Sequence, residues 1–165
     1  MKSVLGITMF LLVSNLAFAQ NRLTKDGVFE FVELNHGIAR IEEGTTEKLK
    51  NSPTGTRGIL QNFEIAIVTD SIEIKPKANF GILYTIKAKQ DTDIDVTFEW
   101  IYPEKIKTED GKKIKSLKFT LSRPTNTDIA SSYSLDTPSE MVKGNWTLNI
   151  YIKGEMLFTR TFVLY

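Results

Sequence analysis

His36 is the residue best suited to act as a general base, because the 165-residue chain has one histidine and no cysteine. Without cysteine, a thiolate nucleophile, a disulfide framework and a cysteine-ligated metal site are excluded. His36 precedes Gly37, a context typical of a loop or strand end, and the chain has no G-x-S-x-G nucleophile elbow. We therefore predict no catalytic residues. The less favoured alternative is a small hydrolase that uses His36 or a pair of carboxylates.

Asp91, Asp93 and Asp95 alternate along one short segment and could offer hard oxygen ligands to Ca²⁺. An EF-hand loop needs Gly at its sixth position and Glu at its twelfth. Counted from Asp91, those positions hold Val96 and Tyr102. The segment is more typical of a solvated turn that leads into the polar face of a strand. No P-loop motif occurs either, so we predict no metal site and no cofactor.

The charges of the chain are balanced, with 21 Lys+Arg, 20 Asp+Glu and a formal net charge of +1. This balance argues against a nucleic-acid partner. Lysines do gather among acidic residues in the segment 104–118, a mixture typical of a soluble hairpin surface, with a patch for an anionic partner as the alternative. These lysines are Lys105, Lys107, Lys112, Lys113, Lys115 and Lys118.

Residues 1–19 have the features of a cleaved secretory signal peptide. Lys2 supplies a positive charge, an apolar stretch follows from Val4 to Phe18, and the segment 17–19 reads Ala-Phe-Ala. The apolar stretch is shorter than the ~20 residues that span a bilayer. We predict an exported protein, periplasmic or extracellular, with no transmembrane segment after cleavage. The remaining domain, residues 20–165, would have a formal charge of zero, because Lys2 is the one charged residue removed.

This domain shows the period-two alternation of β-strands. In the clearest case, Ile94, Val96, Phe98, Trp100 and Tyr102 alternate with mostly polar residues. Similar patterns occupy segments 28–34, 63–67, 82–88, 117–121 and 146–152. Their phase places Trp100 and Trp146 on inward faces, as core residues. Turn sequences and strand-ending prolines separate the segments: Gln90–Asp93, Glu109–Lys112, Lys153-Gly154, Pro103 and Pro124.

About seven or eight short strands in a single domain favour an antiparallel β-sandwich, with a small β-barrel as the alternative. The polar stretch Glu42–Gly58 interrupts the pattern, and we predict a long mobile loop there. A short helical turn over Glu42–Leu49 is the alternative.

Several local motifs, in this order along the chain, resemble the bacterial domain of unknown function family 3859 (DUF3859). The resemblance extends from about Val28 to Phe162, and Glu140–Thr147 followed by Phe162 is its most specific part. The family commonly has His before a strand-ending proline, where this chain has Tyr102. The other motifs are Asn35-His36-Gly37-Ile38, Ser52-Pro53-Thr54-Gly55, Ile74-Lys75-Pro76-Lys77, Phe80-Gly81-Ile82, Tyr102-Pro103 and Thr161-Phe162-Val163.

The resemblance implies a small immunoglobulin-like domain outside the cytoplasm of a Gram-negative bacterium. It implies no reaction, ligand or catalytic residue. At the matched positions we expect Pro76 to set a strand entry, Gly81 to allow close approach of another backbone, and Gly144 to turn the chain toward Trp146.

The favoured function is a non-catalytic module that binds a protein or an envelope component through a sheet edge or through the stretch 42–58. Its ligand-binding residues are unknown. The alternative is a carbohydrate-binding module, which needs aromatic rings exposed on a sheet face or loop. The candidates for such rings are Phe80, Tyr133, Tyr151 and Tyr165.

Overall fold

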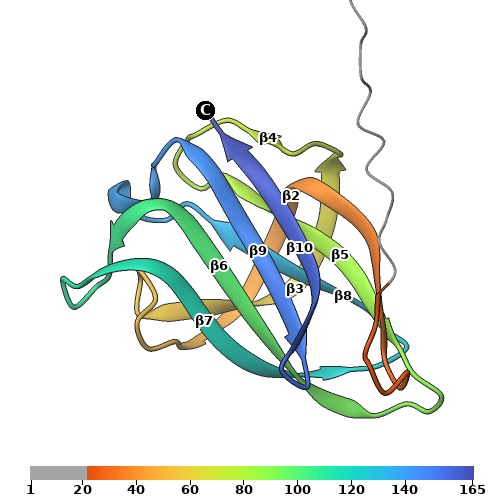
Figure 1. Cartoon of the computed structure of the whole chain (residues 1–165). Coiled ribbons are helices and arrows are strands. Elements are labelled where there is room, and N and C mark those ends of the chain that lie inside the picture. The colour runs from red at the N-terminus through yellow and green to blue at the C-terminus, as the bar shows by residue number, and fades with distance from the viewer. Residues whose placement is uncertain (1–21) are drawn as a thin grey trace, which may run out of the picture.

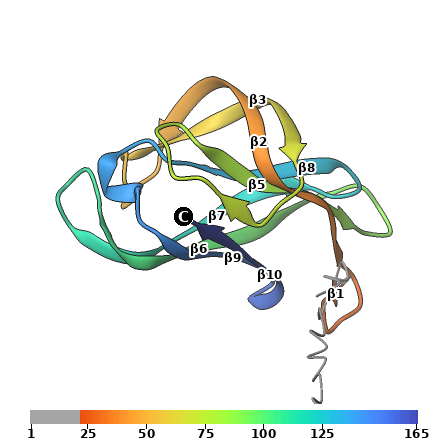
Figure 2. The same ribbon diagram turned by 90° about the horizontal axis from the view of Figure 1, so that it is seen from above.

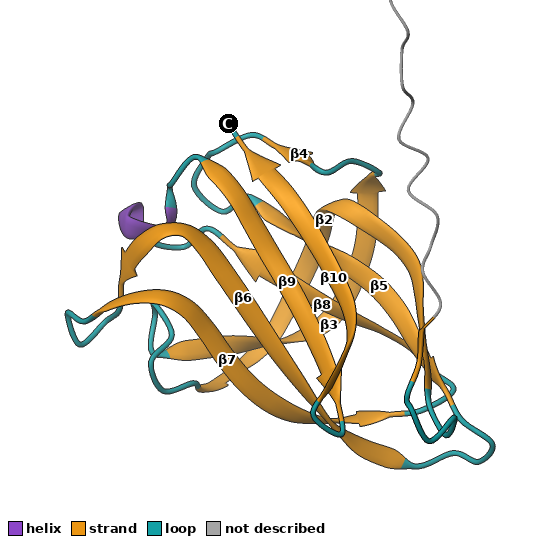
Figure 3. Cartoon of the chain, in the orientation of Figure 1, coloured by secondary structure: helices purple, strands orange, loops and turns teal. Residues whose placement is uncertain are grey.

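The computed structural model describes residues 22–165, so the predicted signal peptide and its cleavage site lie outside the described residues. The described chain folds into two β-sheets packed face to face, and the sandwich is not closed into a barrel (Figures 1 and 3). No helix in this part of the chain is long and apolar enough to span a membrane.

The first sheet has the strand order β1-β2-β5-β8, with β3 also paired to β2. Its strands are β1 (Arg22–Leu23), β2 (Glu30–Lys48), β3 (Thr56–Ile67), β5 (Asn79–Lys87) and β8 (Asp128–Ser134). The second sheet has the order β4-β10-β9-β6-β7. Its strands are β4 (Ser71–Ile72), β6 (Asp93–Lys107), β7 (Lys113–Pro124), β9 (Gly144–Ile152) and β10 (Glu155–Leu164), and a short 3₁₀ helix η1 (Pro138–Glu140) precedes β9.

An aromatic cluster fills the space between the sheets. The Phe80 ring of β5 contacts Trp100, Trp146 and Phe162 edge-on and stacks on Tyr133. Trp100 and Trp146 are fully buried, as their place in the alternation predicted. Successive side chains of a strand point to opposite faces of its sheet. Each sheet therefore turns one apolar face toward the other sheet and exposes the opposite face.

The predicted turns are present, with one difference at a proline. Lys153 and Gly154 both have positive φ, the geometry of a type I′ hairpin turn, and they join β9 to β10. Pro124 ends β7 as expected. Pro103 instead lies inside β6, where the pairing with β7 shifts between Ile101 and Ile106. The irregularity accommodates a residue that cannot donate to the ladder, so the strand continues beyond it.

The prediction of a mobile loop over Glu42–Gly58 is wrong, and so is the alternative helical turn. The structure has a hairpin there: residues 39–48 of β2 pair with residues 56–65 of β3 and form a two-stranded ribbon (residues 39–65). Figure 2 shows this ribbon arching away from the rest of its sheet. No sheet packs on the ribbon over most of residues 42–58, so polar residues predominate there and the alternation that marks the other strands is missing.

β2 changes its pairing partner near His36 and Gly37. Residues 30–38 pair with β5, and from Ile38 onward the strand pairs with β3. The expectation that His36 lies in a loop or at a strand end is therefore also wrong, since the strand continues for another 12 residues. Gly81 lies opposite Gly37, and a Cβ at position 81 would collide with the Ser131 backbone. Gly81 thus permits the close approach of another backbone that we predicted.

Candidate functional site

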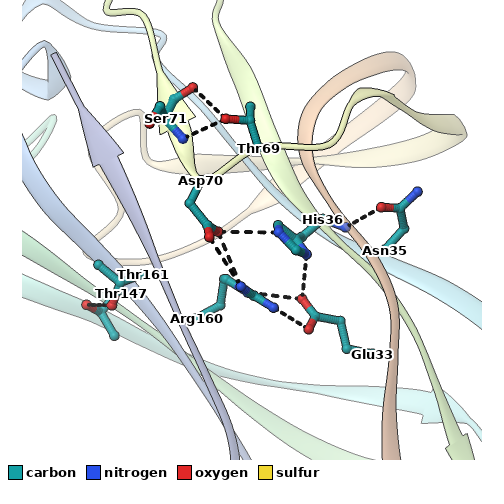
Figure 4. A network of polar contacts seen from close by, with 9 residues as sticks. All are labelled: Glu33, Asn35, His36, Thr69, Asp70, Ser71, Thr147, Arg160 and Thr161. Atoms are coloured by element: carbon teal, nitrogen blue, oxygen red, sulfur yellow. Dashed lines mark hydrogen bonds and ion pairs between the residues drawn. The ribbon is translucent and has the colours of Figure 1, made fainter. Parts of the chain in front are cut away.

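The single histidine belongs to a cluster of four ionisable side chains, His36, Glu33, Asp70 and Arg160, that joins the two sheets (Figure 4). His36 Nδ1 lies 3.3 Å from Glu33 Oε1, and His36 Nε2 lies 3.5 Å from Asp70 Oδ1. Arg160 of β10 donates hydrogen bonds to both Glu33 carboxylate oxygens and to Asp70. The cluster connects β2, the segment before β4, and β10 by ion pairs.

Burial disfavours the charged form of Glu33, but hydrogen bonds from His36 and Arg160 outweigh this and hold its pKa below the ordinary value. Both imidazole nitrogens of His36 face carboxylates, and no hydroxyl nucleophile contacts the ring among the described residues. A Ser-His-Asp arrangement needs one ring nitrogen directed at the nucleophile. The geometry therefore suits an ion-pair cluster that fixes one sheet to the other.

Sequence reasoning singled out His36 and missed its three partners. A usable signal existed, since Glu33 of β2 continues the buried series of Phe31 and of Phe29, which lies just before the strand. Arg160 likewise lies between the buried Phe158 and Phe162 on the inward side of β10. A charged residue at an inward position of a strand is a candidate for a buried ion pair.

A cleft of about 840 Å³ is bordered by β3, β7 and β8. β7 contributes alternate residues, Leu117, Phe119, Leu121 and Arg123, so its inner face lines the cleft. β8 contributes every residue from 128 to 134, and β3 contributes every residue from 56 to 63. Because successive side chains point to opposite faces, consecutive lining residues mean that the edges of β8 and β3 border the cleft.

β7 and β8 are the terminal strands of their sheets. They follow each other in the sequence, converge at residues 125–127 and diverge toward their other ends (Figure 1). The tip of the ribbon lies over the wide end, where Leu49 packs on the core and Ser52 and Pro53 are buried. The cleft is thus a groove with a mixed polar and apolar lining and an unpaired strand edge along one side, covered by the ribbon.

A buried carboxylate, Glu140 of η1, lies at the wide end of the cleft. Its Oε1 accepts a hydrogen bond of 2.7 Å from the Tyr133 hydroxyl, and its Oε2 accepts bonds from the backbone N–H groups of Asp136 and Thr137. Burial raises the pKa of Glu140 above its ordinary value, although the hydrogen bonds from Tyr133 and Thr137 oppose the shift. The Tyr133 and Tyr102 hydroxyl oxygens lie 3.4 Å apart.

The raised pKa of Glu140 predicts a pH dependence of stability. A group whose pKa is higher in the folded state binds its proton more tightly there, so its contribution is complete below the unfolded pKa and is lost as the pH rises through the folded pKa. Glu140→Gln cannot titrate and is expected to lose less unfolding free energy than the wild type between pH 4 and pH 8. Urea unfolding across this range measures the difference, with the exposed Glu104→Gln as control. Parallel curves for wild type and Glu140→Gln would contradict this expectation.

The aromatic residues named as candidates for carbohydrate binding are either buried or far from one another. Phe80 and Tyr133 are core residues, which corrects the expectation that they form an exposed aromatic platform. Tyr151 lies on the outer face of β9, hydrogen-bonded to Glu99 and beneath the Lys118 ammonium group, and Tyr165 is exposed far along the chain. The aromatic rings named for carbohydrate binding therefore form no common surface.

The aspartate series is divided between a turn and a strand. Asp91 accepts a hydrogen bond from the Asn126 amide, while Asp93 and Asp95 belong to β6. Within residues 22–165, no group of three acidic or histidine side chains is arranged to hold a metal ion. Of the clustered lysines, Lys113, Lys115 and Lys118 lie on the edge strand β7, where positive charge discourages pairing with a second sheet.

A model of a protein family described as "Domain of unknown function (DUF3859)" matches residues 28–164. The chain belongs to the DUF3859 family. This match confirms the resemblance seen in the sequence motifs. In this DUF3859 member, Tyr102 occupies the position before Pro103 and is buried against Trp146 and Tyr133.

The fold of this DUF3859 domain is similar to that of an immunoglobulin-like protein from Pseudomonas aeruginosa. The two share 22% sequence identity with a TM-score of 0.58, over 90% of this chain and 99% of that one. An alkylpurine DNA glycosylase from Pseudomonas fluorescens matches 58% of this chain and 27% of its own, at 15% identity and a TM-score of 0.37, which is too low to support an argument. No curated protein matches the chain. The comparisons confirm the immunoglobulin-like sandwich and assign no activity.

Proposed function

We propose that this DUF3859 domain is a non-catalytic module, exported to the periplasm or beyond, that binds an extended segment of a partner protein in the cleft between β3, β7 and β8. The observation that carries the proposal is the unpaired edge of β8, whose seven residues all border the groove, opposite the apolar side chains of β7. The predicted signal peptide supports export, and the immunoglobulin-like fold and the family fit a binding role.

The dimensions and lining of the cleft suit a peptide. At about 840 Å³ it lies in the range of ligand-binding sites. Alternate backbone N–H and C=O groups of β8 lack a ladder partner in the described chain, because β8 pairs only with β5 there. A peptide strand beside β8 would supply those hydrogen bonds and direct alternate side chains toward Leu117, Phe119 and Leu121.

Peptides selected from a random decapeptide library on the immobilised domain test this proposal. Single backbone N-methyl groups are then placed along the tightest binder, and affinity is measured by calorimetry. N-methylation at residues whose N–H faces β8 removes ladder bonds worth about 1 kcal/mol each, so affinity is expected to fall about fivefold per lost bond. Positions one residue away, whose N–H faces the other side, serve as matched controls.

Amide hydrogen exchange shows where on the domain the peptide binds. Bound peptide is expected to slow exchange in residues 128–134 of β8 more than in β4, the edge strand of the second sheet that lies away from the cleft. A library that yields no binder, or binders that tolerate N-methylation at every position, would overturn strand addition at β8.

A further inference from the structure

Arg123 is the last of the inward-facing residues of β7 and lies near the narrow end of the cleft, where β7 leads into β8. Its guanidinium carbon lies 5.6 Å from the centre of the Phe98 ring. The side chain thus reaches from an edge strand toward the core, and its charge partly offsets the burial that raises the pKa of Tyr84. An arginine that only improved solubility would extend into water.

The other charged side chains that line the cleft have partners or lie exposed. Arg57 pairs with Glu47, and Lys77 forms an ion pair of 2.8 Å with Asp136. Glu140 is satisfied by the hydrogen bonds described above. The one remaining charged residue, Asp128, is exposed to solvent.

Arg123 differs from all of these. No described carboxylate lies within 4.0 Å of its guanidinium nitrogens, and its Nε is fully buried without a hydrogen-bond partner. The hydroxyl of the neighbouring Tyr84 is also buried, and its interaction with the Arg123 guanidinium opposes the rise in the Tyr84 pKa that burial causes. Buried cationic groups in folded proteins are usually paired with an anion, so a half-buried guanidinium beside an open groove with no carboxylate among its described contacts has the features of a ligand contact.

We infer that the segment bound in the cleft carries a carboxylate, which Arg123 receives at the narrow end. The inference rests on the proposed function and names the chemistry of its ligand. The planar guanidinium matches a carboxylate with two parallel hydrogen bonds, and the apolar side chains of Phe119 and Leu121 in the cleft strengthen the pairing by excluding water. The carboxylate can belong to an Asp or Glu side chain or to the end of the partner chain.

The test uses decapeptides selected on the wild-type domain, each made in matched forms. One pair differs only by Glu against Gln at a single position, and a second pair differs only by a free against an amidated C-terminus. Calorimetry is expected to show at least about tenfold tighter binding for the carboxylate form of one pair, and the pair that responds identifies the source.

Arg123→Gln is expected to abolish that preference, while Arg123→Lys keeps part of it and Lys118→Gln, on the opposite face of β7, leaves it unchanged within about twofold. Circular dichroism melting checks that each variant is folded. Peptides that bind without a carboxylate preference, or a preference that survives Arg123→Gln, would overturn the role of Arg123 and leave strand addition standing. A library that yields no binder would instead overturn the proposed function, and the inference with it.

Discussion

Replacing Arg160 with Met is expected to lower the free energy of unfolding by about 3–5 kcal/mol, because it leaves a buried carboxylate without its cation. The Glu33 side chain is 5% exposed and receives hydrogen bonds from Arg160 at both of its oxygens. His36 remains nearby in the variant, but it reaches only one of the two oxygens. Urea denaturation at pH 7 measures the loss.

A double variant separates an unpaired charge from lost packing. Glu33→Gln combined with Arg160→Met removes both charges and is expected to recover a large part of the stability lost in Arg160→Met alone. Equal losses in the single and double variants would show that Arg160 stabilises the domain by packing and not by pairing.

The acid side of the stability curve offers a second readout of the same pair. The folded pKa of Glu33 is lower than its unfolded value, so its stabilising contribution is present above the unfolded pKa and is lost as the pH falls through the folded pKa. In Arg160→Met the folded-state pKa of Glu33 is expected to be lowered less. The loss of unfolding free energy on acidification should therefore begin at higher pH and be smaller than in the wild type. If the unfolding free energy of Arg160→Met falls with acidification as it does in the wild type, Arg160 is not the cause of the lowered Glu33 pKa.

Phe80→Ala is expected to cost about 3–5 kcal/mol, the upper range for a buried aromatic residue. Phe80 is fully buried and contacts rings from four other strands, so the cavity would border both sheets and could not collapse without moving them. Urea unfolding should show a lower midpoint with an unchanged slope. Tyr165→Ala, at a ring that is 60% exposed, should stay within about 0.5 kcal/mol of the wild type. A Phe80→Ala loss below about 1 kcal/mol would show that the site repacks.

The sandwich could be predicted from the sequence because strands with one buried face carry a period-two pattern. β6 shows this clearly, since Val96, Phe98 and Trp100 are all buried. The ribbon lacked such a pattern because hydrogen bonds between two strands hold it together with little burial, and hydrogen-bonded backbone leaves no trace in side-chain type. A polar stretch of this kind therefore resembles a loop in the sequence.

The candidate site was only partly predictable for a related reason. A sheet edge was anticipated as a binding surface, but which strand ends a sheet depends on the order of strands, and that order is set by contacts between distant residues. Arg123 looks like an ordinary basic residue on an edge strand. Its position beside the groove, with no carboxylate among its described contacts, became visible only once β3, β7 and β8 were placed around it.

The position of β10 sets the order in which the domain can be completed during synthesis. This strand lies between β9 and β4 and comes last among the strands, yet it supplies Phe162 to the aromatic cluster and Arg160 to the charged cluster. A nascent chain that has left the ribosome only as far as Gly154 has neither of these links between its two sheets. These contacts can form only after β10 has appeared, so the last strand to be synthesised completes both the aromatic core and the charged cluster.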